Sequence, residues 1–156
     1  MLPGRESRTA EYMALFRAAA VSRGLEQVPI VGGGCDSRAH RLVGIHRLVG
    51  IHRLAVFEVD HTATQDVKRG VVEHALGAVP DHVRLVPIDF DHESLADGLA
   101  AASVREGRPT FTVWEGVASY PTPAGVDGTL RAVGGLSGPG SELVMTYVHP
   151  RADFAG

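Results

Sequence analysis

The feature that most constrains the fold is a regular alternation between short runs rich in valine and isoleucine and longer amphipathic stretches. This alternation is typical of parallel α/β sheets, in which each buried strand is followed by a crossover helix. The sequence therefore predicts an α/β fold with a mostly parallel sheet. We expect five strands, near Gln27–Val31, Leu54–Val59, Val83–Ile88, Thr110–Trp114 and Glu142–Val148.

A helix is predicted between the second and third strands. Residues 62–65 have the spacing of a capping box, which predicts that the helix begins at Thr62. Apolar residues then recur at helical intervals up to Gly77, and we expect them on the buried face. These positions are Val67, Val71, Val72, Ala75 and Leu76.

Three further helices are predicted from their apolar faces and end signals. One contains Leu95 and Leu99, and another begins after Thr122 and stops at Gly134 and Gly135. A third, over residues 9–23, precedes the first strand. We expect residues 1–26 to form an N-terminal helix region and residues 27–156 to form one domain.

Composition excludes several classes of function. The 156 residues include 15 basic and 18 acidic side chains, a balance unsuited to binding nucleic acid through its phosphates. The sequence has neither a signal peptide nor an apolar run of about 18 residues, so we expect a cytoplasmic protein that does not associate with membranes. Cys35 is the single cysteine, which rules out an intramolecular disulfide and a cysteine-based metal site.

A hexapeptide at residues 41–46 is repeated without change at residues 47–52. Two copies are too few for a solenoid, and six residues turn a helix by about 600°, which places the copies on different faces. We interpret the repeat as a local duplication. His46 and His52 do not match the ligand spacings typical of zinc, and we expect no metal site.

Three consecutive glycines, Gly32, Gly33 and Gly34, follow the first predicted strand. Such loops bind nucleotide-like cofactors, because glycine allows a sharp turn and close approach of a ligand to the backbone. Ser37 stands where the dinucleotide fingerprint has its third glycine, which argues against a cofactor that contains pyrophosphate. A plain turn without a ligand is the alternative.

Asp60 ends the second predicted strand, at the edge of the sheet where the glycine loop is expected. One carboxylate can accept hydrogen bonds from both hydroxyls of a ribose, so Asp60 is a candidate for binding that sugar. The alternative is that Asp60 caps the following helix. Glu58, two residues earlier, is interpreted as a solvated charge at the strand end.

Acidic residues also follow the third and fourth predicted strands. Asp89 would accept a hydrogen bond from an adenine amino group, and Phe90 would lie against the purine. The alternative is that Asp89 or Asp91 caps the next helix and Phe90 belongs to the core. Glu115 would hold a cationic group such as a sulfonium, and its alternative is an exposed charge.

Taken together, these segments resemble the leucine carboxyl methyltransferase family. The similar segments are residues 7–17, 28–42, 56–61, 86–89 and 114–123. The resemblance implies a Rossmann-like class I methyltransferase fold with S-adenosyl-L-methionine as its cofactor. It further implies that Gly32, Gly33 and Gly34 hold the methionine part, Asp60 the ribose and Asp89 with Phe90 the adenine, with Glu115 beside the methionine part.

The chain departs from the family pattern in two ways. Family members are longer, with a segment before the first strand and further elements after the fifth, so we expect a sheet truncated after its fifth strand. Its uncovered edge would offer a surface for a homodimer. Pro29 also falls in what the family makes a central strand, where proline removes a ladder hydrogen bond.

The sequence thus predicts an S-adenosylmethionine-dependent methyltransferase that acts on a small carboxylate or hydroxyl acceptor. A carboxylate is already ionised at pH 7 and needs no general base, whereas Tyr120, Tyr147 or His149 would assist a hydroxyl. The alternative is that each of these three residues has a packing role or lies at the surface. The alternative is a truncated or degenerate methyltransferase-like domain that binds cofactor or a partner without turnover. A nicotinamide oxidoreductase is disfavoured by Ser37 and by the lack of an acid suited to hydride transfer.

Overall fold

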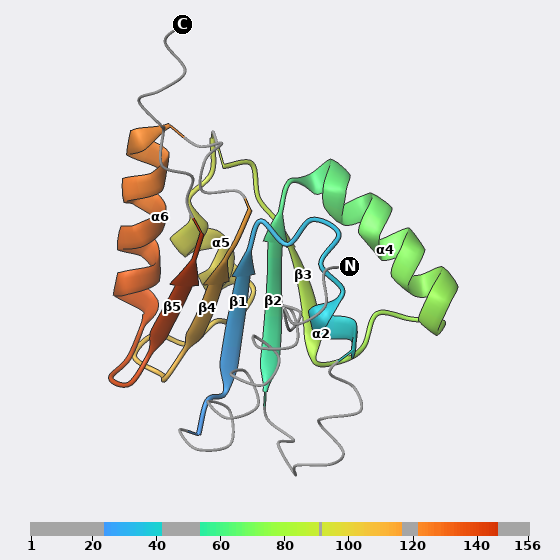
Figure 1. Cartoon of the computed structure of the whole chain (residues 1–156), viewed down its shortest axis with the longest axis horizontal. Helices are drawn as coiled ribbons and strands as arrows, with labels where there is room; N and C mark the ends of the chain where they lie inside the picture. The colour runs from blue at the N-terminus through green and yellow to red at the C-terminus, as the bar shows by residue number, and fades with distance from the viewer. Residues whose placement is uncertain (1–23, 42–53, 91, 117–121, 147–156) are drawn as a thin grey trace, which may run out of the picture.

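A computed structural model describes residues 24–41, 54–90, 92–116 and 122–146 of the chain. In this part of the chain, five strands form one parallel sheet in the order β3-β2-β1-β4-β5 (Figure 1). The predicted fold class and strand positions are confirmed, although several strand ends differ from the prediction. The strands are β1 (Gln27–Val31), β2 (Ala55–Asp60), β3 (Val83–Pro87), β4 (Phe111–Trp114) and β5 (Glu142–Met145).

Helices cover both faces of the sheet. Helices α5 (Leu95–Ala101) and α6 (Pro123–Leu136) lie on one face, and α2 (Arg38–Arg41) and α4 (Thr62–Leu76) lie on the other (Figure 1). Each face has its own apolar core, one containing Ala39 of α2 and the other containing residues of α5 and α6. None of the helices in the described ranges is long and apolar enough to cross a membrane.

Strand β2 contributes side chains to both cores, because successive residues of a strand point to opposite faces. Val56 packs in the core on the α2 side, whereas Phe57 and Val59 pack in the core with α5 and α6. Glu58 and Asp60 have the same parity as Val56. The alternation therefore directs both carboxylates toward the face that carries α2 and α4.

Pro29 lies in the central strand β1, in register with Phe57 of β2. On its other side, β1 forms a continuous ladder with β4 only at its last two residues, Ile30 and Val31. The ladder is interrupted around Pro29 because proline has no N–H to donate. The sheet thus tolerates the missing hydrogen bond while β1 remains central.

The capping box predicted at the start of α4 is wrong. His61 is the N-cap, and its Nδ1 accepts a hydrogen bond from the Ala63 N–H at 3.4 Å. The Gln65 side chain does not reach back to the first turn as a capping box requires, and instead donates to the Glu58 carbonyl at 2.7 Å.

The predicted buried face of α4 is also largely wrong. Val67, Val71 and Leu76 are 70%, 63% and 55% exposed. The helix instead buries Gln65, Lys68 and Val72. Polar side chains face the sheet here because β2 presents the Glu58 carboxylate to this helix, and a buried carboxylate requires polar partners.

Helix α6 continues through Gly134 and Gly135, where the sequence predicts its end, and stops at Leu136. Burial of Val133 and Leu136 stabilises the last turn, and the Ser137 N–H donates to the Val133 carbonyl at 3.1 Å. Several predictions lie outside the described residues: the N-terminal helix, residues 42–52 of the repeat with His46 and His52, and Asp91, Tyr120, Tyr147 and His149.

Candidate functional site

The predicted site residues follow the carboxyl ends of four parallel strands and therefore lie along one edge of the sheet. Their order is Asp89 after β3, Asp60 at the end of β2, the glycine loop (Gly32–Gly34) after β1, and Glu115 after β4. The chain order reverses at β1, which lies between β2 and β4. Ligands of open α/β sheets bind outside the carboxyl ends at such a switch point.

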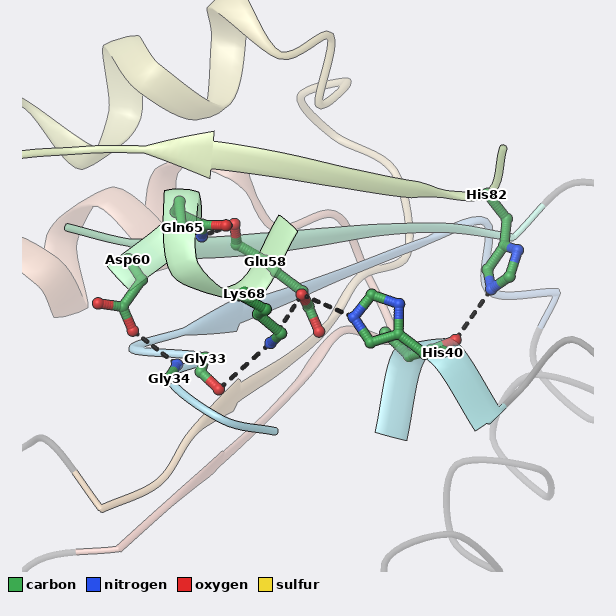
Figure 2. Close-up of polar contacts among 9 residues, drawn as sticks. Gly33, Gly34, His40, Glu58, Asp60, Gln65, Lys68 and His82 are labelled. Carbon is green, nitrogen blue, oxygen red and sulfur yellow. Dashed lines mark hydrogen bonds and ion pairs between the residues drawn. The ribbon is translucent and has the colours of Figure 1, made fainter. Parts of the chain in front are cut away.

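The glycine loop is fixed to the end of β2. The N–H groups of Gly32 and Gly33 donate to the Val59 carbonyl at 2.8 and 3.1 Å, and the Gly34 N–H donates to Asp60 Oδ2 at 2.6 Å (Figure 2). Gly32 and Gly34 have φ of 70° and 40°, a left-handed conformation that favours glycine. Because its three amides already have acceptors in β2, the loop does not offer them to a phosphate.

The Asp60 carboxylate orients the loop and retains capacity for a ligand. Its Oδ1 accepts the His61 N–H at 2.7 Å, and its Oδ2 accepts the Gly34 N–H at 2.6 Å. An ionised carboxylate has about four lone-pair positions, so about two remain for further donors. Since His61 is the N-cap of α4, the alternative that Asp60 caps this helix is wrong.

Asp89 and Phe90 lie beside the end of β2, because the preceding Ile88 N–H donates to the Asp60 carbonyl at 2.9 Å. Asp89 Oδ2 lies 3.0 Å from His92 Nδ1. The N-cap of α5 is Ser94, so Asp89 does not cap that helix. Phe90 is 39% exposed, which shows that it is not a core residue and leaves its ring accessible to a ligand.

Glu115 is half-buried at the end of β4. The adjoining turn is attached to the end of β5, because the Gly116 N–H donates to Thr146 Oγ1 at 2.9 Å and the Thr146 N–H donates to the Trp114 carbonyl at 3.1 Å. These hydrogen bonds fix the backbone on both sides of Glu115 at the same edge as the glycine loop.

A buried polar cluster lies beneath the loop and contradicts the interpretation of Glu58 as a solvated charge. The Glu58 side chain is 0% exposed, and its Oε2 lies 2.8 Å from Lys68 Nζ and 3.3 Å from His40 Nε2 (Figure 2). Burial raises the pKa of Glu58, and this effect outweighs the attraction of Lys68 and His40. Lys68 Nζ also contacts the Gly33 carbonyl at 3.5 Å.

Sequence reasoning missed Lys68 and His40, although a signal for Lys68 exists. Lys68 is the single lysine among 15 basic residues and follows Gln65 and precedes Val72 at helical spacing. A glutamate inside a strand that is covered on both faces also calls for a buried cation. Together these two features indicate a buried cationic partner for Glu58, whereas the contact between α4 and β2 that forms the pair is seen only in the structure.

A cavity of about 470 Å³ lies between the glycine loop, α2 and α4. Val67, Val71 and Val72 line its apolar side. Gly34 is the one residue among the predicted cofactor contacts that lines it, so the cavity flanks the sheet on the α4 side and does not extend along the carboxyl edge. Within the described ranges, no group of three or more histidine, cysteine or acidic residues is arranged to hold a metal ion.

Comparisons with known proteins agree with this architecture. A Thermobifida fusca crystal structure assigned as a methyltransferase matches 92% of this chain and 53% of its own, with 19% identity and a TM-score of 0.67. The PKMT2 structure from Rickettsia typhi, in complex with AdoHcy, matches 92% of this chain and 26% of its own, with 16% identity and a TM-score of 0.57. The fold is therefore that of class I methyltransferases.

The relatives found by sequence have higher identities to this chain than these two structures. A Mycolicibacterium paratuberculosis protein assigned as an S-adenosyl-L-methionine-dependent methyltransferase is 33% identical over 98% of this chain and 47% of its own length. A Mycolicibacterium gilvum protein of the same assignment is 35% identical over 100% of this chain and 48% of its own. The chain thus spans about half the length of these relatives. The leucine carboxyl methyltransferase model matches residues 4–134, and the chain belongs to the leucine carboxyl methyltransferase family.

Proposed function

We propose that this chain binds S-adenosyl-L-methionine along the carboxyl edge of its sheet and takes part in methyl transfer to a small carboxylate or hydroxyl acceptor. The observation that carries the proposal is the order of side chains along that edge. From β3 to β4 the edge presents Asp89 with Phe90, then Asp60, the glycine loop and Glu115. This order matches adenine, ribose and the methionine part with its sulfonium.

The chemistry of each position supports this assignment. The exposed ring of Phe90 offers an apolar surface for adenine. Asp60 retains acceptor positions for the two ribose hydroxyls after it accepts two backbone N–H groups. Glu115 provides a negative charge on the side of the loop where the cationic sulfonium would lie.

The geometry also distinguishes this cofactor from a nicotinamide dinucleotide. A pyrophosphate needs N–H donors from the glycine loop, and here the amides of Gly32, Gly33 and Gly34 donate to β2. Asp36 adds a negative charge just after the loop, which would repel a pyrophosphate. The names of the sequence relatives and the AdoHcy in the PKMT2 structure agree with this choice.

S-adenosyl-L-methionine supplies the electrophilic methyl group, so the residues of this chain contribute binding, orientation and charge. Asp60 and the glycine loop would hold the cofactor so that an acceptor oxygen can approach in line with the bond from sulfur to methyl. A carboxylate acceptor needs no base, because its pKa of about 4 leaves it ionised at neutral pH.

A homodimer through the β5 edge of the sheet is the second part of the proposal. In the described part of the chain, β5 pairs with β4 alone, and its four residues are half-buried. Parallel strands at such an edge have backbone groups that a second chain can satisfy. Sedimentation velocity over a concentration series tests this, and a monomer at every concentration would remove the dimer from the proposal.

Calorimetric titration with S-adenosylmethionine, its demethylated product and NAD tests the cofactor. We expect the first two to bind and NAD to bind more weakly. Asp60→Ala should weaken binding by about 1–3 kcal/mol, the usual effect of losing a hydrogen bond to a charged group. Asp66→Ala, which removes an exposed carboxylate from α4, is the matched control and should leave the affinity unchanged.

Incubation with methyl-labelled cofactor and a panel of carboxylate and phenolic acceptors tests the transfer itself. Label recovered on an acceptor supports the full proposal. Binding without transfer supports the alternative of a domain that holds cofactor without turnover. Unchanged affinity in Asp60→Ala would exclude Asp60 from the site, and tighter binding of NAD would overturn the choice of cofactor.

A further inference from the structure

The peptide group between Gly33 and Gly34 is held from both sides. No peptide bond within the described ranges is cis, so the C=O and N–H of this group point in opposite directions. The Gly33 carbonyl accepts the Asp36 N–H at 2.7 Å. The same carbonyl also faces Lys68 Nζ at 3.5 Å, and the Gly34 N–H donates to Asp60 Oδ2 at 2.6 Å (Figure 2). The orientation of this one peptide therefore couples a lysine on α4 to the carboxylate at the end of β2.

Lys68 is fixed well enough to act as an anchor. Its side chain is 8% exposed, and its ammonium lies 2.8 Å from the fully buried Glu58 carboxylate, which His40 contacts from the other side. Three consecutive residues of β2 thus determine the loop conformation: Glu58 through Lys68, Val59 through its carbonyl, and Asp60 through its carboxylate.

Lysine rather than arginine occupies position 68, and the two side chains differ in the contacts that they can make there. The chain has 15 basic residues, and the one lysine among them occupies this buried position. An ammonium is a compact point charge that can direct its N–H groups to a carboxylate and a carbonyl at once, whereas a planar guanidinium is larger and has a fixed geometry. The ammonium at position 68 can therefore contact both Glu58 and the loop.

We propose that Lys68 is a positioning residue for the cofactor, which sets the affinity for its ribose by holding the peptide that orients Asp60. This inference rests on the proposed function. Without the ammonium, the Gly33 carbonyl keeps the Asp36 N–H as a donor but loses its contact with α4, so the loop is no longer tied to this helix. The Gly34 N–H that orients Asp60 can then shift with the loop, and the remaining acceptor positions of Asp60 no longer face the ribose hydroxyls in one geometry.

The experiment measures calorimetric affinities for S-adenosylhomocysteine and for its 2′,3′-dideoxy analogue. In Lys68→Met, affinity for S-adenosylhomocysteine should fall on the order of tenfold, and affinity for the analogue should change little, because the analogue makes no hydrogen bond to Asp60. Arg69→Met is the matched control, since it removes an exposed positive charge from the neighbouring position of α4 and should leave both affinities unchanged.

A combined variant separates positioning from general destabilisation. Lys68→Met leaves the Glu58 charge buried without its ammonium partner, so the double variant Glu58→Gln with Lys68→Met provides a neutral pair. It should fold, as circular dichroism and urea unfolding will show, and should keep the selective loss for the ribose-containing ligand. Lys68→Met combined with Asp60→Ala should bind no more weakly than Asp60→Ala alone, because both changes remove the same interaction.

The outcomes distinguish the two proposals. If S-adenosylhomocysteine does not bind the unaltered chain, the proposed function fails and this inference fails with it. If the unaltered chain binds and Asp60→Ala weakens binding, the function stands. In that case unchanged affinity in both lysine variants, an equal loss for the two ligands, or additive effects of Lys68→Met and Asp60→Ala would overturn the role of Lys68 alone.

Discussion

Glu58 introduces a carboxylate into a part of the sheet that is covered on both faces. Its partners Lys68 and His40 come from α4 and α2, so the cluster joins three elements around one buried charge. Breaking such a pair by removing one partner typically costs about 3–5 kcal/mol, because the other charge is left buried. Removing one charged partner from this cluster should therefore destabilise the native structure.

Stability should depend on pH through Glu58. Because burial raises its pKa above the ordinary value of 4.5, the folded chain holds this proton more tightly than the unfolded chain. The stability that the protonated group contributes is fully present below pH 4.5 and is lost as pH rises through the raised pKa. Glu58→Gln should therefore lose less stability than the unaltered chain as pH rises from about 4.5.

Urea unfolding midpoints measured from acidic to neutral pH test this difference. Asp127→Asn is the control, because it removes an exposed carboxylate that pairs with Arg131 on α6. At neutral pH its stability should stay close to that of the unaltered chain, because an exposed ion pair contributes little. Identical pH profiles for Glu58→Gln and the unaltered chain would show that Glu58 does not titrate differently in the two states.

At the residue scale, the sequence alone predicts the positions of those candidate site residues that lie at strand ends. The glycine loop, Asp60, Asp89 and Glu115 were predicted at one edge, and the structure places them there. Lys68 and the burial of Glu58 were not predicted. The ion pair between them forms because α4 packs its polar side against β2, and no local sequence pattern specifies this contact between elements.

At the scale of elements, two glycines that look alike in the sequence have opposite structural roles. Gly98 in α5 packs against the buried Ile88, and a Cβ at this position would overlap the Ile88 side chain. Gly70 in α4 has nothing within 4 Å of its Cβ position. The close approach of α5 to the sheet therefore depends on Gly98, whereas α4 gains nothing from Gly70.

Alanine substitution at the two glycines should change stability in opposite directions. Gly98→Ala should destabilise the chain by about 1–3 kcal/mol, the usual effect of overpacking a core. Gly70→Ala should stabilise it by about 0.5–1 kcal/mol, because alanine loses less backbone entropy in a helix. Urea unfolding of both variants provides the measurement. A Gly98→Ala variant as stable as the unaltered chain would show that α5 can move away from Ile88.

Helix faces and ends were harder to predict than strands. The valines of α4 repeat at helical spacing, yet Val67 and Val71 are mostly exposed because the polar partners of Glu58 occupy the buried face. Gly134 and Gly135 indicated the end of α6, but burial of Leu136 extends the helix past them. In both cases packing between elements overrides a local preference.

At the scale of the whole molecule, the order of the strands places the four strand ends in one row, and a cofactor bound there would contact all of them. A ligand that binds only the folded chain raises its stability by about 2.7 kcal/mol at a concentration 100 times its Kd. For a chain of this size we expect a rise in Tm of roughly 5–10 °C with S-adenosylhomocysteine.

Differential scanning calorimetry with S-adenosylhomocysteine, adenosine and NAD at matched concentrations measures this stabilisation. Adenosine should raise the Tm less than S-adenosylhomocysteine, because it would contact only the residues at the ends of β3 and β2. A rise with NAD as large as that with S-adenosylhomocysteine would contradict the assignment of the edge to a cofactor without pyrophosphate.

The buried carboxylate of β2 also determines how this strand can align with its neighbours. Consecutive side chains of a strand face opposite ways, so a slip of β2 by one residue would turn Glu58 into the core that contains Leu99 and Trp114. It would also move a β2 apolar side chain into the position opposite Lys68. Both charges would then be buried without each other, an arrangement that costs several kcal/mol. The ion pair therefore selects one alignment of β2, a strand whose apolar residues could pack on either face of the sheet.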